Sequence, residues 1–270
     1  MLTLVATPIG NLQDISSRAK ESIGTCDVLL CEDTRHSLKL LNCLDLAKPA
    51  MVSLHKFNES AKQEQILQWL REGKNVVLIS DAGTPGICDP GARLVRACHD
   101  EHIRVSIIPG PCAFACAFAV SGIETTPVQF LGFLPKKETE RKKALQELLV
   151  YPGTSIVYES PNRLLSTIEL TAEIDPSWKI TLTRELTKIH EQVLVTTASE
   201  LLSTPFEAKG ECTIVFHPNL AEHLRPDDKA IVRQVEQLRK QFSCSLKEAV
   251  ELTACHLRLS QREVYQTCIS

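Results

Sequence analysis

Short apolar runs alternate with amphipathic stretches along the N-terminal part of the chain. The apolar runs predict strands at Leu2–Ala6, Asp27–Cys31, Ala50–Leu54, Asn75–Ile79 and Arg104–Ile108. Helical spacing predicts helices at Ile15–Thr25, Glu59–Glu72 and Arg93–Glu101, with Asp14 as the N-cap of the first and Gly73 just beyond the second. This alternation predicts an α/β fold whose N-terminal domain has a parallel sheet with helices on both faces.

The pattern changes after a break at Gly122–Pro127. Further strands are predicted at Val128–Phe133, Thr154–Tyr158, Trp178–Arg184, Gln192–Thr197 and Cys212–Phe216, with a helix at Arg163–Glu173. The last three strands have only one short helix among them, which favours antiparallel pairing. We therefore expect a second α/β domain with a mixed sheet.

A linker is predicted at Pro218–Pro226, followed by a small helical appendage. Its helices are expected at Asp227–Gln241, Leu246–His256 and Gln261–Thr267, with Ser245 and Ser260 at N-cap positions. The last two helices resemble a helix-turn-helix in outline. The predicted domains are residues 1–122, 127–218 and 226–270.

Composition refines this picture. A length of 270 residues suits two domains, and a formal charge of −3 means that any nucleic-acid contact must use local basic patches. The eleven cysteines are scattered without a CxxC pair, as expected of reduced thiols that serve as small apolar side chains. No signal segment is expected before the first strand, and the longest apolar run, Cys112–Val120, is too short to span a bilayer. We expect a cytoplasmic protein with no membrane partner.

Glycine and proline gather where three predicted strands end: in Thr7–Asn11, in Ser80–Gly91 and in Pro109–Cys112. Ligands of open α/β sheets bind outside the carboxyl ends of the strands, and such loops bring bare backbone close to a ligand. Each loop alone equally fits a tight turn. The chain has neither GxxxxGK[ST] nor GxGxxG after its first strand, which argues against a P-loop or a standard dinucleotide site.

The motifs VATPIGNLQDISSRA, CEDTRH, SDAGTPGICDPG, PGPCA, GFLP, YESPNR, RELTK and KGE occur in this order. In this combination the chain resembles the tetrapyrrole-methylase superfamily, and within it the bacterial 16S rRNA (cytidine-2′-O)-methyltransferases. The resemblance covers essentially the whole chain. It implies two α/β domains with S-adenosylmethionine bound between them, a homodimer, and methylation of a decoding-centre cytidine in 16S rRNA within the small ribosomal subunit.

The resemblance also implies which residues bind the methyl donor. From the three N-terminal loops these are Pro8, Ile9, Gly10, Asp81, Gly83, Thr84, Pro85, Cys112 and Ala113. From the second domain they are Leu131, Phe133, Tyr158, Lys209, Gly210 and Glu211.

A ribose hydroxyl is a poor nucleophile at neutral pH, so a nearby charged group is expected to take its proton or orient it. The candidates are charged residues at predicted strand ends: Glu32, Asp33, Arg35, Glu159, Arg184, Glu185 and Lys188. Of these, Glu185, Glu32 and Lys188 are predicted to be catalytic, and Glu185 or Glu32 is expected to orient or deprotonate the hydroxyl. Each equally fits a structural role: Glu185 as the partner of Arg184 in a salt bridge, and Asp33, beside Glu32, as a helix cap. The histidines show no metal-ligand spacing, and no metal is expected.

The RNA surface is predicted from basic residues near the GFLP loop and after the second strand: Arg35, Lys136, Lys137, Arg141, Lys142, Lys143 and Arg163. Glutamates interleave with the lysine run, so a solvated helix face is the alternative. Two other functions stay open from the sequence: C-methylation of a tetrapyrrole, and a ribosome-assembly factor that retains the fold without catalysis.

Overall fold

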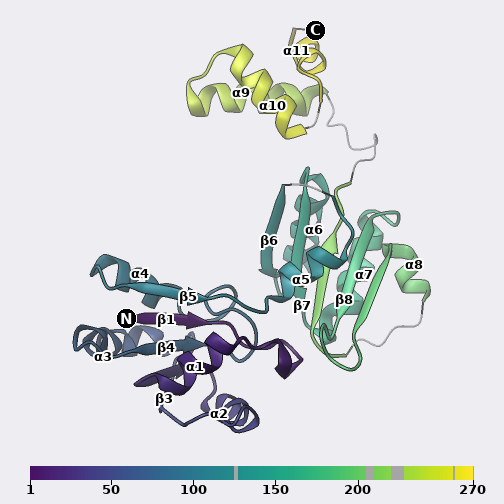
Figure 1. Cartoon of the computed structure of the whole chain (residues 1–270). Coiled ribbons are helices and arrows are strands. Elements are labelled where there is room, and N and C mark those ends of the chain that lie inside the picture. The colour runs from purple at the N-terminus through teal and green to yellow at the C-terminus, as the bar shows by residue number, and fades with distance from the viewer. Residues whose placement is uncertain (125–126, 205–208, 220–227, 258, 270) are drawn as a thin grey trace.

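The computed structural model describes residues 1–124, 127–204, 209–219, 228–257 and 259–269. Its first sheet is wholly parallel, in the order β3-β2-β4-β1-β5 (Figure 1). The strands are β1 (Leu2–Val5), β2 (Val28–Cys31), β3 (Ala50–Ser53), β4 (Val76–Ile79) and β5 (Val105–Ile108). The predicted parallel sheet is thus confirmed.

Helices cover both faces of this sheet. Leu4 of β1 joins the apolar cluster of α3 (Glu59–Arg71) and α4 (Ala92–Asp100), whereas Val5 joins that of α1 (Ser17–Thr25) and α2 (Thr34–Cys43). The alternation follows from the pleat, which turns successive side chains to opposite faces. Both faces are therefore buried, as expected of a parallel sheet.

One predicted helix start is wrong. Asp14 lies in a short 3₁₀ helix, η1 (Leu12–Asp14), and the hydroxyl of Ser16 caps α1 by accepting from the Ala19 amide at 3.1 Å. Serine accepts such bonds as readily as aspartate, and Ser16 stands two residues after Asp14, so the helix starts later than predicted. Gly73 lies just past α3 with φ of +82°, as predicted for a C′ glycine.

The second sheet is mixed, in the order β6-β7-β10-β8-β9, with only β6 and β7 parallel. Its strands are β6 (Val128–Phe133), β7 (Thr154–Glu159), β8 (Lys179–Arg184), β9 (Gln192–Thr197) and β10 (Cys212–Phe216). One face packs against α6 (Glu138–Val150), α7 (Pro161–Ile174) and α8 (Ala198–Ser203), around the buried side chains of Trp178 and Phe216. The antiparallel pairing predicted for the last three strands is confirmed.

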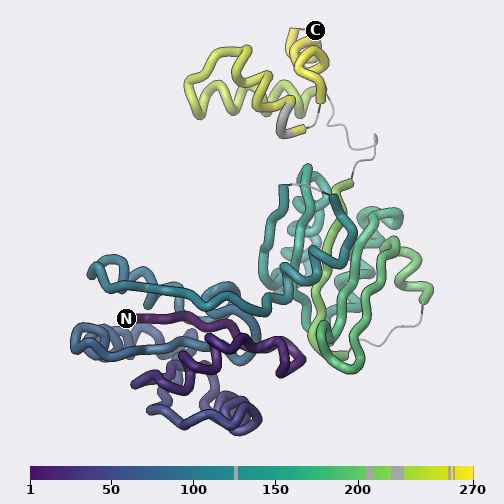
Figure 2. The backbone as a smooth tube through the Cα atoms, viewed as in Figure 1, coloured from purple at the N-terminus to yellow at the C-terminus, as the bar shows by residue number. Residues whose placement is uncertain are grey.

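The other face of the second sheet is covered by α5 (Ala113–Val120), which follows the first sheet in the chain. Figure 2 shows this teal segment leaving β5 and running along β7 and β10. Ala117 of α5, Ile156 of β7 and Val215 of β10 form an apolar cluster that also takes in Ile9 from the loop after β1. This cluster fixes the first loops against the second sheet.

The C-terminal helices α9 (Asp228–Phe242), α10 (Leu246–Leu257) and α11 (Gln261–Ile269) pack on one another around Ile231, Val250 and Val264. Both predicted N-caps are confirmed. Ser245 and Ser260 each accept from the amide of the glutamate three residues later, and each glutamate accepts in return from the serine amide. The predicted linker 218–226 lies largely outside the described residues.

Glu59, at the start of α3, is buried and caps the next helix. Its Oε1 accepts from the amides of Gly91 and Leu94, each at 3.1 Å. Glu59→Ala is expected to lower the free energy of unfolding by about 2–5 kcal/mol, because two buried N–H groups lose their acceptor. Urea unfolding followed by circular dichroism measures the loss. Glu64→Ala, which removes an exposed ion pair with Arg71, should cost under about 1 kcal/mol. Equal costs for the two variants would contradict this role of Glu59.

Candidate active site

The three Gly/Pro loops meet because β4, β1 and β5 are neighbours in the sheet. Thr7 and Gly83 exchange backbone hydrogen bonds of 2.9 and 3.0 Å, which join the loops after β1 and β4. The hydroxyl of Thr84 donates to the Pro111 carbonyl at 3.0 Å, which joins the loops after β4 and β5. The loops therefore form one bonded unit at the carboxyl edge of the sheet.

A cavity of about 380 Å³ opens between this unit and the second sheet. Nine of the residues predicted for donor binding line it: Ile9, Asp81, Gly83, Thr84, Cys112, Ala113, Phe133, Tyr158 and Glu211. The lining also includes residues that were not predicted for donor binding: Ala82, Ile87, Cys88, Asp89, Glu159, Ser160, Pro161, Cys212 and Thr213. All but Cys212 and Thr213 lie within the quoted motifs SDAGTPGICDPG and YESPNR, so the motifs were found but too few of their residues were assigned to the site.

Six predicted residues do not line the cavity: Pro8, Gly10, Pro85, Leu131, Lys209 and Gly210. Gly10 and Gly210 lie against the loop after β8, described below. The Lys209 carbonyl accepts from Arg184 at 3.3 Å, and Leu131 is exposed on the edge strand β6.

An aromatic wall closes the side of the cavity formed by β6 and β7. The register between β6 and β7 shifts between Phe130 and Phe133, where Gly132 has φ of +68°. The irregularity leaves the exposed Phe133 ring edge-on to Tyr158, with centroids 5.7 Å apart. The Phe114 amide donates to the Tyr158 hydroxyl oxygen at 3.2 Å, and burial raises the pKa of that phenol. Tyr158 thus ties β7 to the start of α5.

Carboxylates gather where the loops after β2 and β4 meet. The Asp33 amide donates to Asp81 Oδ1 at 3.3 Å, which brings the two loops together. Burial, followed by the charge of Glu32, raises the pKa of Asp89 to about 6. Burial, followed by the charge of Asp81, raises the pKa of Glu32. Sequence analysis missed Asp89, although it stands in the quoted SDAGTPGICDPG motif, because a carboxylate next to proline also reads as a turn.

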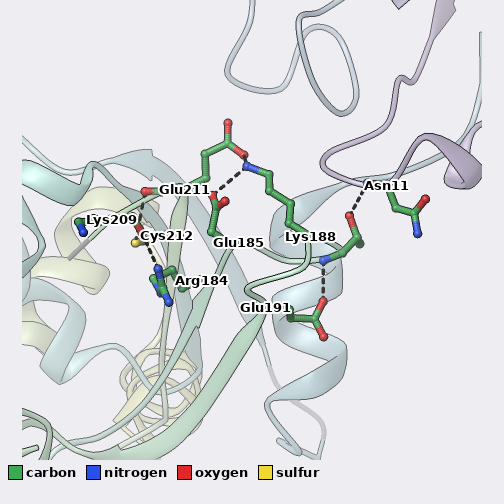
Figure 3. Close-up of polar contacts among 10 residues, drawn as sticks. Asn11, Arg184, Glu185, Lys188, Glu191, Lys209, Glu211 and Cys212 are labelled. Atoms are coloured by element: carbon green, nitrogen blue, oxygen red, sulfur yellow. Dashed lines mark hydrogen bonds and ion pairs between the residues drawn. The ribbon is translucent and has the colours of Figure 1, made fainter. Parts of the chain in front are cut away.

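The loop after β8 carries two predicted catalytic residues, Glu185 and Lys188. Lys188 Nζ donates to Glu185 at 2.8 Å and to Glu211 at 3.1 Å, as Figure 3 shows. Burial alone would raise the pKa of Glu185, but the bonds from Lys188 and the Glu211 amide lower it overall. Burial alone would lower the pKa of Lys188, but its two carboxylate partners raise it overall. These two carboxylates therefore favour the charged form of Lys188.

The expected pairing of Glu185 with Arg184 differs from the structure. Arg184 donates instead to Gln192 at 3.0 Å and to the Lys209 carbonyl at 3.3 Å. Glu185 follows the end of β8 with φ of +50°, and its carboxylate accepts from Lys188 and from the Glu211 amide instead. The alternative for Asp33 is confirmed: its carboxylate caps α2 by accepting from the Arg35 amide at 2.8 Å.

Two arginines predicted to contact RNA instead bond to other residues of the protein. Arg141 is only 4% exposed and donates to Ser166 at 2.7 Å, so its guanidinium does not reach the surface. Arg163 pairs with the buried Glu159 at 2.5 Å and donates to the Leu134 and Pro135 carbonyls. Arg163 thus binds the carbonyls of the GFLP segment, and Arg141 binds the Lys136 carbonyl that follows it.

The other predicted basic residues lie on the surface, where several pair with acids. Lys137, Lys142 and Lys143 pair with Glu140, Glu173 and Glu147, respectively. Arg35 is bound by Asp33 through two nitrogens, yet its side chain is 87% exposed. Lys136 is exposed at the start of the α6 segment. The lysine run therefore combines a solvated helix face with cations that remain accessible.

The cysteines with described side chains are free, and burial raises the pKa of the Cys112 thiol in the cavity wall. A thiol so protonated is a poor nucleophile. Among the described side chains, no three of the types that bind metals cluster as a metal site would require. Within the same described ranges, no helix has the length and apolar character needed to cross a bilayer.

Comparison with known proteins defines the class. The family model of the tetrapyrrole (corrin/porphyrin) methylases matches residues 1–202, and the chain belongs to this family of methyltransferases. The ribosomal RNA small subunit methyltransferase I of Synechocystis sp. is 38% identical to it over 276 residues, covering 98% of this chain and 96% of that protein. The Bacillus subtilis protein of the same name is 36% identical over 272 residues, covering 98% and 92%. The resemblance predicted from the motifs is confirmed.

A solved structure supports the fold. Cobalt precorrin-4 methyltransferase, a cobalamin biosynthetic enzyme, aligns with a TM-score of 0.57 at 18% identity, covering 80% of this chain and 94% of that one.

The raised pKa of Asp89 predicts a pH-dependent stability. The folded protein disfavours the charged form of Asp89. The contribution of this carboxyl group to the free energy of unfolding is therefore complete below pH about 4 and is lost as the pH rises through about 6. Asp89→Asn is expected to gain stability relative to the wild type from pH 4 to pH 8, by about 1 kcal/mol after allowance for solvent screening. Thermal unfolding at several pH values measures the difference. Asp100→Asn, on exposed α4 surface, is the control; a difference for Asp89→Asn that does not change with pH would contradict the expectation.

Proposed function

We propose that this protein uses S-adenosylmethionine to methylate the ribose 2′-hydroxyl of a decoding-centre cytidine in 16S rRNA of the small ribosomal subunit. The observation that carries the proposal is the cavity between the three Gly/Pro loops and the second sheet, in a chain that matches ribosomal RNA small subunit methyltransferases I over nearly its whole length. On the family resemblance, we also propose a cytoplasmic homodimer.

The cavity suits the donor in size and in charge. A volume of about 380 Å³ lies within the range of roughly 300–1,000 Å³ typical of small-molecule sites. Asp81, Asp89 and Glu211 supply negative charge that matches a sulfonium and an ammonium group. The start of α5, at Cys112 and Ala113, supplies the positive end of a helix dipole that matches a carboxylate.

When bound, the donor supplies an electrophilic methyl group for in-line displacement by the ribose oxygen. The residues of the chain orient that oxygen and accept its proton. Glu185 is held as a carboxylate by Lys188, and Glu211 of the same cluster reaches the cavity. Glu32 lies near enough to Asp81 and Asp89 to interact with their charges, and its raised pKa makes it a stronger base than Glu185. Positioning by the closed cleft supplies further acceleration, up to about 7–11 kcal/mol in favourable cases.

The substrate assignment is tested with labelled donor and three acceptors: small ribosomal subunits from cells that lack this enzyme, free 16S rRNA, and a porphyrinogen. We expect label on one cytidine ribose, which makes the adjacent phosphodiester resistant to alkali. Transfer to the porphyrinogen alone would identify a tetrapyrrole methyltransferase. Donor binding without transfer to any acceptor would favour an assembly factor, and both results would overturn the proposal.

The roles of the two carboxylates are tested in single turnovers. Glu185→Gln and Glu32→Gln should each keep donor affinity, and the variant that removes the proton acceptor should slow transfer by about 100- to 10,000-fold. A smaller loss of rate in the other variant would assign its carboxylate to orienting the ribose hydroxyl rather than accepting the proton. Glu173→Gln, in an exposed pair on α7, serves as the control. Glu185 and Glu32 do not line the cavity themselves, and wild-type rates in both Glu185→Gln and Glu32→Gln would exclude them from the mechanism.

A further inference from the structure

The loop between β3 and α3 presents an aromatic side chain to solvent from a rigid backbone. Phe57 is 92% exposed. The His55 amide donates to Asn58 Oδ1 at 2.8 Å, and Asn58 Nδ2 donates to the Ser53 carbonyl at 3.1 Å. Lys62 Nζ donates to the same carbonyl at 2.7 Å. The loop is thus closed at both ends by hydrogen bonds of its own.

The ring itself is also oriented. The Phe57 amide donates to His55 Nδ1 at 3.3 Å, and the two rings lie edge to face with centroids 6.2 Å apart. Little of the Phe57 ring is buried, so folding gains little from it. A large apolar ring that is fixed in orientation but exposed to solvent is suited to contact a partner.

This loop is linked to the cavity through two bonded steps. Ser53 Oγ donates to the Glu32 carbonyl at 3.1 Å, and the Leu54 amide donates to the Cys31 carbonyl at 2.7 Å, which places the loop beside the end of β2. The Asp33 amide then donates to Asp81, which lines the cavity. Phe57 therefore stands at the outer end of the same sheet edge that forms the cavity.

A cation adjoins the exposed ring in the chain. Lys56 is exposed and makes no ion pair that the described part of the chain shows. Arg35, in the first turn of α2, pairs with Asp33 while its guanidinium stays open to solvent. An exposed aromatic ring next to a lysine matches a stretch of unpaired nucleic acid, whose bases stack on rings and whose phosphates bind cations.

We propose that the His55–Asn58 loop is an RNA-contact site in which Phe57 stacks on an unpaired base near the reacting nucleotide and Lys56 contacts a phosphate. The inference rests on the proposed function and extends it, because it adds a second RNA contact at the sheet edge opposite the GFLP segment. The loop holds one base in place while the reacting nucleotide occupies the cavity.

The test titrates the full chain into a single-stranded RNA decamer that carries one 2-aminopurine, whose fluorescence falls when the base stacks. Phe57→Ala should weaken binding by about 5- to 100-fold and abolish the quenching. Phe57→Trp should keep both the affinity and the quenching of the wild type, whereas Phe57→Leu should lose both. Phe242→Ala, which truncates an exposed phenylalanine of α9, is the matched control and should bind like the wild type.

Salt dependence isolates the phosphate contact. Lys56→Ala should weaken binding by the same factor for RNA decamers of different sequence. It should also reduce the slope of log affinity against log salt by about 1. In methyl transfer to small subunits, Phe57→Ala should raise KM for the particle by the same factor as in the titration and leave donor affinity unchanged.

The outcomes separate this site from the proposed function. If the wild type methylates the particle and Phe57→Ala binds and reacts equally well, the loop is not an RNA contact, although the proposed function stands. If Phe57→Leu matches the wild type, the ring makes only an apolar contact, as with a protein partner, and stacking is overturned. If the wild type methylates no RNA, the proposed function fails, and the titration still decides whether Phe57 stacks on a base.

Discussion

The contact between the loop after β1 and the loop after β8 is the constraint on which the cavity depends. A Cβ on Gly10 would lie 2.5 Å from Lys188 Cγ and 2.6 Å from Thr187 Oγ1, so only glycine fits this approach. The Asn11 amide donates to the same Thr187 hydroxyl at 3.0 Å. On its other side the β8 loop packs on Gly210, where any Cβ would overlap Glu185. Two glycines from distant parts of the chain thus accommodate one charged loop between the domains.

This loop stores backbone strain. Glu185 and Thr187 have φ of +50° and +67°, a region that costs residues other than glycine about 1–3 kcal/mol each. The bonds of Lys188 to two carboxylates and of Thr187 to the first loop offset that cost. The cluster of Glu185, Lys188 and Glu211 reaches the cavity through Glu211, which lines it.

The periodic parts of the structure were predictable, and the exceptions have identifiable causes. Both sheets followed from apolar runs and from the spacing of helices between them. Helix α5 was not predicted because Ala113–Val120 is apolar on every side, so its sequence has no amphipathic period, although only Ala117 is fully buried. Arg141 was placed on the surface because a basic run predicts exposure; the helix turned that one position toward Ser166. The raised pKa of Asp89 and the ion pair of Lys188 with Glu211 depend on contacts between distant loops, which spacing along the chain does not encode.

Donor affinity in Gly10→Ala tests most directly whether docking of the β8 loop builds the cavity. The added methyl must displace Lys188 and Thr187, so calorimetric titration with S-adenosylmethionine should show affinity reduced at least about 10-fold, with both domains still folded by circular dichroism. Gly24→Ala, whose new Cβ would meet only Leu46 at 3.8 Å, should bind the donor as the wild type does. Equal affinity in the two variants would contradict the account, because the cavity would then form without the contact at Gly10.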